Sequence, residues 1–155
     1  MAETQVDNFF AIVAHRSRWY HKDKSGVLQN AGVLDSSYKV PGGGLISSAD
    51  DMARFEIAIM ANKLLKPATR EVMWTPLKAA DGSQNGYALG WGNSEKFGLS
   101  LVSHSGSQQG TSTSILLMPE RRAGIVVLVN MDDADATALS TEILQISLDL
   151  QDQSE

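Results

Sequence analysis

Three short apolar segments lie close together between residues 99 and 130, and only a few turn residues separate them. The segments are residues 99–103, 112–118 and 123–130. The linkers are too short for a crossover helix, which needs about a dozen residues or more, so neighbouring strands are expected to pair in antiparallel fashion. A further short strand is expected at residues 87–91, which makes the sheet a meander of hairpin-connected strands.

The last of these segments is the most apolar part of the chain. Residues 125–129 read Ile-Val-Val-Leu-Val without a polar interruption. A continuous β-branched run indicates a strand that is covered on both faces. We therefore expect residues 123–130 to form a central strand of the sheet.

Helices are expected before and after the sheet. Ser48 followed by Asp51 is a capping-box pattern, which predicts a helix that continues to about residue 62. Pro67 suits the first position of a short helix over residues 67–74. Apolar residues at helical spacing predict a final helix over residues 134–150 that packs on the sheet. The fold class is α+β: an antiparallel meander packed by a C-terminal helix, with helices preceding the sheet.

The two ends of the chain carry weaker patterns. Residues 11–20 and 27–33 are expected to form a short hairpin around the turn sequence Asp-Lys-Ser-Gly at residues 23–26. Residues 151–155 are expected to fray.

Composition describes one globular domain over residues 1–155, with 43% hydrophobic residues and enough length for a core. The net charge of −5 argues against nucleic acid or an anionic membrane surface as a partner. No apolar run approaches the ~20 residues of a membrane span, and the acidic N-terminus is unlike a signal peptide. The absence of cysteine excludes disulfides and thiolate sites but leaves the compartment open. No cofactor and no metal site are predicted.

The strongest candidate for chemistry is His104-Ser105-Gly106, followed by Ser107, at the expected end of the strand over residues 99–103. A histidine can donate a hydrogen bond or carry charge near neutral pH. Gly106 allows a ligand or another backbone to approach closely. The N–H of Ser107 could point at an oxyanion. On the tripeptide alone, a polar strand end whose histidine caps a loop is the simpler interpretation.

Neighbouring segments, taken in order, resemble the penicillin-binding-protein-like serine hydrolases, which include class C β-lactamases, DD-peptidases and related esterases. Residues 41–55 resemble the family's Gly-Gly, Ser-Thr and Asp segment, and residues 86–92 resemble its Tyr-Gly-x-Gly-Trp strand. Residues 110–130 resemble its last strands. His104-Ser105-Gly106 falls where the lactamases carry Lys-Thr-Gly and many relatives carry His-x-Gly. The order and spacing hold over roughly residues 15–148, which implies a partial β-lactamase/transpeptidase-like fold.

The family's nucleophile motif, Ser-x-x-Lys, and its base motif, Tyr-x-Asn, would both lie before this chain begins. No Tyr-x-Asn occurs here. One Ser-x-x-Lys string does occur, from Ser36 to Lys39, but it lies in a connector just before Pro41 and is interpreted as a coincidence. The resemblance therefore implies the C-terminal part of a β-lactamase-like serine hydrolase that lacks its N-terminal half.

In the complete protein, the resemblance implies two-step acyl transfer on a small-molecule ester or amide. His104 and Ser105 would orient the substrate carboxylate or leaving group, and the Ser107 N–H would supply half of the oxyanion hole. The chain alone is expected to be inactive and to form a homo-oligomer, because its sheet edge and apolar face would normally meet the missing half. The family also implies a periplasmic or secreted protein. The alternative is a non-catalytic binding or regulatory module that retains the scaffold.

Two other patterns favour structural roles. Residues 41–44 could form a phosphate cradle before a helix, but Asp50 and Asp51 would repel an anion, so a structural turn is expected. The acidic residues 132–135 lack the glycine and distal glutamate of a calcium loop, and they suit a helix N-cap.

Overall fold

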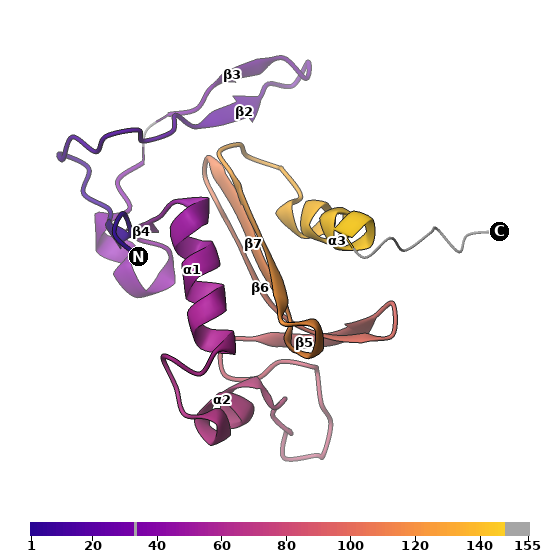
Figure 1. Cartoon of the computed structure of the whole chain (residues 1–155). Helices are drawn as coiled ribbons and strands as arrows, with labels where there is room; N and C mark the ends of the chain where they lie inside the picture. Colours follow the sequence, from indigo (N-terminus) through magenta and orange to yellow (C-terminus); the bar gives the residue numbers. More distant parts are fainter. Residues whose placement is uncertain (33, 148–155) are drawn as a thin grey trace.

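A four-stranded antiparallel sheet with the order β5-β6-β7-β8 forms the centre of the computed structural model, which describes residues 1–32 and 34–147 (Figure 1). The strands are β5 (Gly92–Lys96), β6 (Leu99–Gln108), β7 (Thr111–Met118) and β8 (Ala123–Val129). Consecutive strands pair with each other throughout. The predicted antiparallel meander is therefore confirmed.

Helices cover both faces of this sheet. Helix α1 (Ala49–Met60) lies on one face and α3 (Ala136–Ser147) on the other, while α2 (Pro67–Trp74) lies near the β5 end (Figure 1). Two hydrophobic clusters result, because side chains alternate between the faces of each strand. The cluster on the α1 side contains Ile59, Trp74, Trp91, Val102, Ile115 and Leu117. The cluster on the α3 side contains Leu99, Leu101, Leu116, Met118, Ile125 and Leu144.

Strand β8 lies at the edge of the described sheet, so the prediction of a central strand at residues 123–130 is wrong. Its continuous apolar sequence has a different cause, because α1 and α3 both contact it. Ile125 belongs to the cluster on the α3 side. Gly124, which points the other way, packs against Glu56 of α1. The apolar run therefore reflects cover on both faces, and this cover occurs at an edge strand.

Two strand boundaries also differ from the sequence prediction. Strand β6 continues past residue 103 to Gln108, so the His104-Ser105-Gly106 stretch lies inside a strand rather than at its end. Its polar half pairs with the polar start of β7, which backbone hydrogen bonds permit without apolar side chains. The strand predicted at residues 87–91 is absent. Gly86 and Gly90 have φ angles of 74° and 78° and turn the chain, so that β5 begins only at Gly92.

The two predicted helices before the sheet are confirmed. Helix α1 begins after Ser48, whose hydroxyl accepts a hydrogen bond from the N–H of Asp51 at 3.3 Å. It ends at Met60, two residues earlier than predicted. Helix α2 starts at Pro67 and ends at Trp74, as its sequence predicts.

The final helix, α3, is confirmed over Ala136–Ser147, so it starts two residues later than the predicted residue 134. It begins at Ala136 because the Asp135 carboxylate caps it and accepts a 2.8 Å hydrogen bond from the N–H of Ala138. The predicted end of this helix, at residues 148–150, and the fraying predicted after it lie outside the described residues. Within residues 1–32 and 34–147, no helix is long and apolar enough to cross a membrane.

The N-terminal third contains small two-stranded sheets. Strands β2 (Tyr20–Lys22) and β3 (Leu28–Asn30) form the predicted hairpin, although both are shorter than expected and residues 11–19 are not a strand. The expected end of the second strand, residue 33, lies outside the described residues. Strand β1 (Gln5–Val6) pairs with β4 (Leu45–Ile46), which the sequence did not predict. Two 3-10 segments, η1 (Ser37–Gly42) and η2 (Pro119–Arg121), complete the fold.

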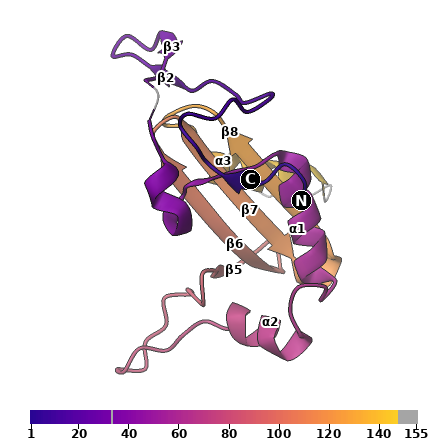
Figure 2. The ribbon, with the colours of Figure 1, turned by 90° about the vertical axis from the view of Figure 1, so that its left-hand side faces the viewer.

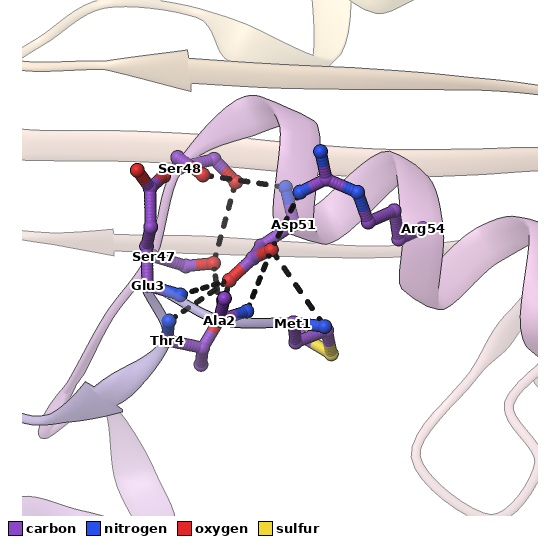
Figure 3. A network of polar contacts seen from close by, with 8 residues as sticks. All are labelled: Met1, Ala2, Glu3, Thr4, Ser47, Ser48, Asp51 and Arg54. Carbon is purple, nitrogen blue, oxygen red and sulfur yellow. Dashed lines mark hydrogen bonds and ion pairs between the residues drawn. The ribbon is translucent and has the colours of Figure 1, made fainter.

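The Asp51 side chain on α1 binds the backbone of residues 2–4 at the start of the chain (Figure 3). Its fully buried carboxylate accepts hydrogen bonds from the N–H groups of Ala2, Glu3 and Thr4 at 3.1, 2.7 and 2.9 Å. The Thr4 hydroxyl and the Arg54 guanidinium also donate to it, at 3.0 and 2.8 Å.

This set of donors determines the ionisation of Asp51. Burial alone would raise the pKa of Asp51, but the hydrogen bonds from Glu3, Thr4, Arg54 and Ala2 outweigh it and hold the pKa well below its usual value. Only one of the two hydrogen bonds of the predicted capping box is therefore formed. Ser48 accepts from the N–H of Asp51, whereas the Asp51 carboxylate binds the N-terminal segment.

Candidate active site

Residues 104–108 form the part of β6 that extends beyond its neighbour β5. Strand β5 pairs with β6 only as far as the pair Gly92 and Ser103. Strand β7 pairs with β6 on the other side as far as Gln108. Among the described residues, no strand pairs with residues 104–108 on the β5 side, and η1 contacts only the Gln108 end through Lys39 and Gly43. We call this side of residues 104–107 the open edge.

The two hairpin turns that flank β6 indicate which backbone groups point to the open edge. Two-residue turns at residues 97–98 and 109–110 join β6 to β5 and to β7. The two residues that flank such a turn form both of their backbone hydrogen bonds with each other. Successive residues along a strand then direct their N–H and C=O groups towards opposite neighbouring strands. Odd-numbered residues of β6 therefore bond towards β5, and even-numbered residues bond towards β7. Beyond the end of β5, Ser105 and Ser107 present their N–H and C=O groups to the open edge.

The side chains of this stretch alternate between the two faces of the sheet. His104 and Gln108 line a groove on the α1 side, whereas Ser105 and Ser107 line a shallower depression on the α3 side. His104, Ser105, Gly106 and Ser107 are all exposed. A Cβ atom at Gly106 would lie 3.2 Å from the Thr113 hydroxyl, so only a glycine fits there without displacing its neighbour. The structure thus brings the four predicted site residues together on one accessible segment.

The groove on the α1 side has a volume of about 1070 Å³. The N-terminal segment, the start of α1 and the ends of β6, β7 and β8 surround it. Its apolar lining includes Met52, Phe55, Ile115, Val126 and Leu128, and its polar lining includes His104, Gln108, Thr111 and Thr113. This volume is slightly above the roughly 300–1,000 Å³ of small-molecule pockets, so the groove is large enough for a protein segment as well.

The His104 ring has a side-chain partner in the loop before β5. Its Nε2 atom lies 3.1 Å from the hydroxyl of Tyr87, and the two rings are tilted by 55° with centroids 6.4 Å apart. Tyr87 lies in a strand in the sequence prediction and is not among the predicted site residues. The glycines at 86 and 90 on either side of it were the signal for a loop.

Among the described residues, the side chains of Ser36 and Lys39 form no hydrogen bond with each other. Ser36 is only 2% exposed, and among the described residues its hydroxyl has no hydrogen-bond partner. Lys39 instead donates a hydrogen bond from Nζ to the Gln108 side-chain oxygen at 3.1 Å. This arrangement agrees with the interpretation of the Ser-x-x-Lys string as a coincidence.

The glycines at 42–44 form a tight structural turn. A Cβ atom at Gly44 would lie 2.6 Å from the backbone oxygen of Ser36, and Gly43 has a φ of 133°.

The acidic residues 132–135 also have structural roles. Asp132 accepts a hydrogen bond from the N–H of Gly110, and Asp135 caps α3. In the part of the chain that the structure describes, no group of three or more metal-binding side chains comes together.

Comparisons with known proteins agree with the resemblance in the sequence. The family model described as Beta-lactamase matches residues 1–148. The mouse protein "Serine beta-lactamase-like protein LACTB, mitochondrial" is 32% identical over 135 residues, which cover 70% of this chain and 24% of that protein. This chain therefore spans about a quarter of that relative.

Solved structures with the same fold cover almost all of the chain. A penicillin-binding protein from Bacillus halodurans superposes with a TM-score of 0.74 at 20% identity, over 94% of this chain and 45% of that one. An octameric penicillin-binding protein homologue from Pyrococcus abyssi superposes with a TM-score of 0.72 at 24% identity, over 90% of this chain and 32% of that one. These similarities show a β-lactamase/transpeptidase-like fold that is present here in part.

Proposed function

This chain belongs to the beta-lactamase family, and from that premise we propose that it is the C-terminal part of a serine acyl-transfer hydrolase. It supplies one wall of the active site, with His104, Ser105, Gly106 and Ser107 on strand β6. The nucleophilic serine and the groups that move its proton come from a complementary N-terminal part. The substrate is a small-molecule ester or amide.

The open edge of β6 is the observation that carries this proposal. Ser107 presents its backbone N–H to that edge, where it can donate to the oxygen of a substrate carbonyl. A donor that is fixed in a strand stabilises the oxyanion without reorganising during the reaction. Ser105 presents a second N–H and C=O two residues away, which can align an extended substrate along the strand.

His104 acts on the leaving-group side of the reaction. The serine oxygen attacks the substrate carbonyl carbon, and the leaving group departs with a proton. Water then attacks the acyl-enzyme, which releases the acid and restores the serine. His104 is exposed on the groove side of β6, and its hydrogen bond with Tyr87 orients the ring. An imidazole in this position can hydrogen-bond to the leaving group or transfer a proton to it.

In this proposal, the complementary part binds in the groove next to His104. Its predominantly apolar lining from α1, β7 and β8 would otherwise remain in contact with water. A helix that carries the serine could pack there and bring its hydroxyl to the open edge of β6. Without that part the chain binds no acyl group covalently and is inactive.

Exposed apolar residues on α3 support self-association as well. Leu139 and Ile143 are each 42% exposed and Ile146 is 75% exposed, although the same helix buries Leu144 completely. A solved relative is described as octameric. We expect sedimentation measurements on the purified chain to show a homo-oligomer, and Ile146→Lys to shift it towards the monomer.

Reassembly of the complete active site tests the proposed function. The chain is co-expressed with the segment that is encoded upstream of it, and ester hydrolysis is measured for the complex. We expect hydrolysis by the complex and none by the chain alone. His104→Ala is expected to lower kcat/KM at least about tenfold. His21→Ala, which changes the half-buried histidine of β2, is the matched control.

Two outcomes would count against the proposal. If His104→Ala leaves kcat/KM within about threefold of the unmodified complex, the role of His104 is wrong. If no upstream segment restores hydrolysis, a non-catalytic binding or regulatory module becomes the better account of the scaffold.

A further inference from the structure

We propose that Lys39 forms an anion-binding subsite at the turn end of β6, and that this subsite selects acyl groups that carry a second, terminal carboxylate. The selectivity for acyl groups rests on the proposed function, whereas the binding of an anion at Lys39 does not. Neither the resemblance to the family nor the predicted site residues include Lys39.

The side-chain amide of Gln108 links the Lys39 ammonium group to the backbone of Gly43. The amide oxygen of Gln108 accepts a hydrogen bond from Lys39 Nζ at 3.1 Å. The amide nitrogen donates to the backbone oxygen of Gly43 at 3.2 Å. Because each end of the amide has its own partner, the amide cannot flip without losing both bonds. The ammonium group is therefore positioned beside the last residue of β6.

The backbone around Lys39 is equally constrained. Its N–H donates to the Ser36 oxygen at 3.0 Å, and its C=O accepts hydrogen bonds from Gly43 and, at 3.0 Å, from Gly44. A side chain at position 44 would collide with the Ser36 oxygen at 2.6 Å. The turn at residues 42–44 thus folds tightly around the lysine. A site that is positioned before the ligand arrives loses less conformational entropy on binding.

Lys39 forms no ion pair within the part of the chain that the structure describes. Among the described residues, no carboxylate lies within 4 Å of its Nζ atom. The side chain is half-buried, and its Nζ atom lies 5.7 Å from the centroid of the Tyr38 ring. An ammonium group has three N–H donors, and Gln108 accepts from only one of them. The two remaining donors and the unpaired charge suit a carboxylate ligand.

The position of this subsite along β6 defines the part of the substrate that reaches it. Figure 2 shows the η1 segment as a purple coil beside the outer edge of β6, on the side away from β8. Gln108 directly follows Ser107, whose N–H would bind the reacting carbonyl. His104 lies roughly 13 Å from Gln108 along the strand and would face the leaving group. A group near Lys39 therefore belongs to the acyl side.

Anion binding can be tested on the purified chain without any catalytic activity. The probes are glutarate and, as a neutral analogue, glutaramide at constant ionic strength. The readout is the chemical shift of the Gln108 side-chain amide and of the Gly43 and Gly44 N–H groups. We expect saturable shifts with glutarate alone. They should disappear in Lys39→Met, persist in Lys39→Arg, and persist in Lys22→Met, which removes an exposed lysine of β2.

The same titration defines the results that overturn the subsite. Equal shifts with glutarate and glutaramide would mean that charge does not select the ligand. Unchanged glutarate shifts in Lys39→Met would place the anion elsewhere. Absence of any shift in the unmodified chain would mean that the chain has no such subsite.

Selectivity for the acyl group is tested in the reassembled enzyme, with mono-p-nitrophenyl glutarate and p-nitrophenyl hexanoate as substrates. Lys39→Met is expected to lower kcat/KM for the glutarate ester at least about tenfold more than for the hexanoate ester. Lys39→Arg should restore most of the preference. Hydrolysis of both esters with an unchanged ratio would contradict the acyl selectivity. Failure to hydrolyse either ester would contradict the proposed function and, with it, the acyl selectivity, while the titration still tests anion binding.

Discussion

The Nε2 atom of His104 and the hydroxyl of Tyr87 lie 3.1 Å apart, which joins the open part of β6 to the loop that precedes β5. Both side chains are exposed, so this hydrogen bond orients the imidazole on a surface that leaves it accessible. The lysine that the lactamases carry at this position has a permanent charge. A histidine needs an orienting partner as well as the correct protonation state.

We predict that Tyr87→Phe lowers kcat/KM for ester hydrolysis by the reassembled enzyme about two- to tenfold. This range corresponds to the loss of one hydrogen bond that orients a catalytic group. The matched control is Tyr20→Phe, a change in the N-terminal hairpin. Equal rates for Tyr87→Phe and the unmodified enzyme would show that the hydroxyl does not orient His104.

Asp51→Asn is predicted to lower the midpoint temperature of unfolding by roughly 5–10 °C, because a neutral amide cannot replace the carboxylate that binds three N–H groups and Arg54. The amides of residues 2–4 should also exchange faster with solvent. Asp50→Asn, which changes an exposed acid in the same turn, is the control.

The low pKa of Asp51 also predicts how this stabilisation depends on pH. A depressed pKa in the folded state gives stability that is complete above the unfolded value of about 4 and is lost as the pH falls below it. The difference in stability between the unmodified chain and Asp51→Asn should therefore shrink in acid. A difference that stays constant down to about pH 2 would contradict the assignment.

Glu56 is expected to have the opposite pH dependence. It is 3% exposed and packs against Gly124 of β8, and its Oε1 has no hydrogen-bond partner among residues 1–32 and 34–147. Burial raises the pKa of Glu56 from 4.5 to about 7. The folded chain should therefore lose stability as the pH rises from about 4.5 through 7, because the carboxyl group must then ionise in a buried site.

We predict that Glu56→Gln removes this loss and raises the free energy of unfolding above pH 7 by no more than about 3 kcal/mol. Denaturant unfolding at about pH 5 and pH 8 is the measurement, with Glu71→Gln, an exposed glutamate of α2, as the control. An equal effect of Glu56→Gln at both pH values would contradict the raised pKa.

Gly44→Ala is predicted to destabilise the chain by about 1–3 kcal/mol, because the new methyl group would lie 2.6 Å from the Ser36 oxygen and would force the turn open. Gly42→Ala is the matched control, since a Cβ atom at Gly42 meets nothing within 4 Å. Equal unfolding free energies for the two variants would show that the turn tolerates a side chain at position 44.

Local patterns in the sequence predicted the elements that local physics determines. Ser48 and Pro67 marked the starts of α1 and α2, and the short linkers predicted the antiparallel meander. The apolar run of β8 predicted cover on both faces, but an edge strand with a helix on each side has the same composition as a central strand. Strand β6 was predicted too short because its second half contains serine and glycine, and its backbone pairing depends on the partner β7.

The contacts that position the site residues join distant parts of the chain, which is why the sequence did not predict them. Lys39 and Gln108 are 69 residues apart, and Tyr87 and His104 are 17 apart. Asp51 was expected to complete a capping box, yet its carboxylate binds residues 2–4, which no local pattern indicated. The motif order predicts which residues form the candidate site, and the fold determines how their side chains are arranged.

Mass spectrometry of the covalent acyl-enzyme tests the central claim most directly. The reassembled enzyme is treated with a fluorophosphonate or with penicillin, digested, and searched for the modified serine. We expect the label on a serine of the complementary part and none on this chain, alone or in the complex. A label on Ser36, or on any other serine of this chain, would contradict it.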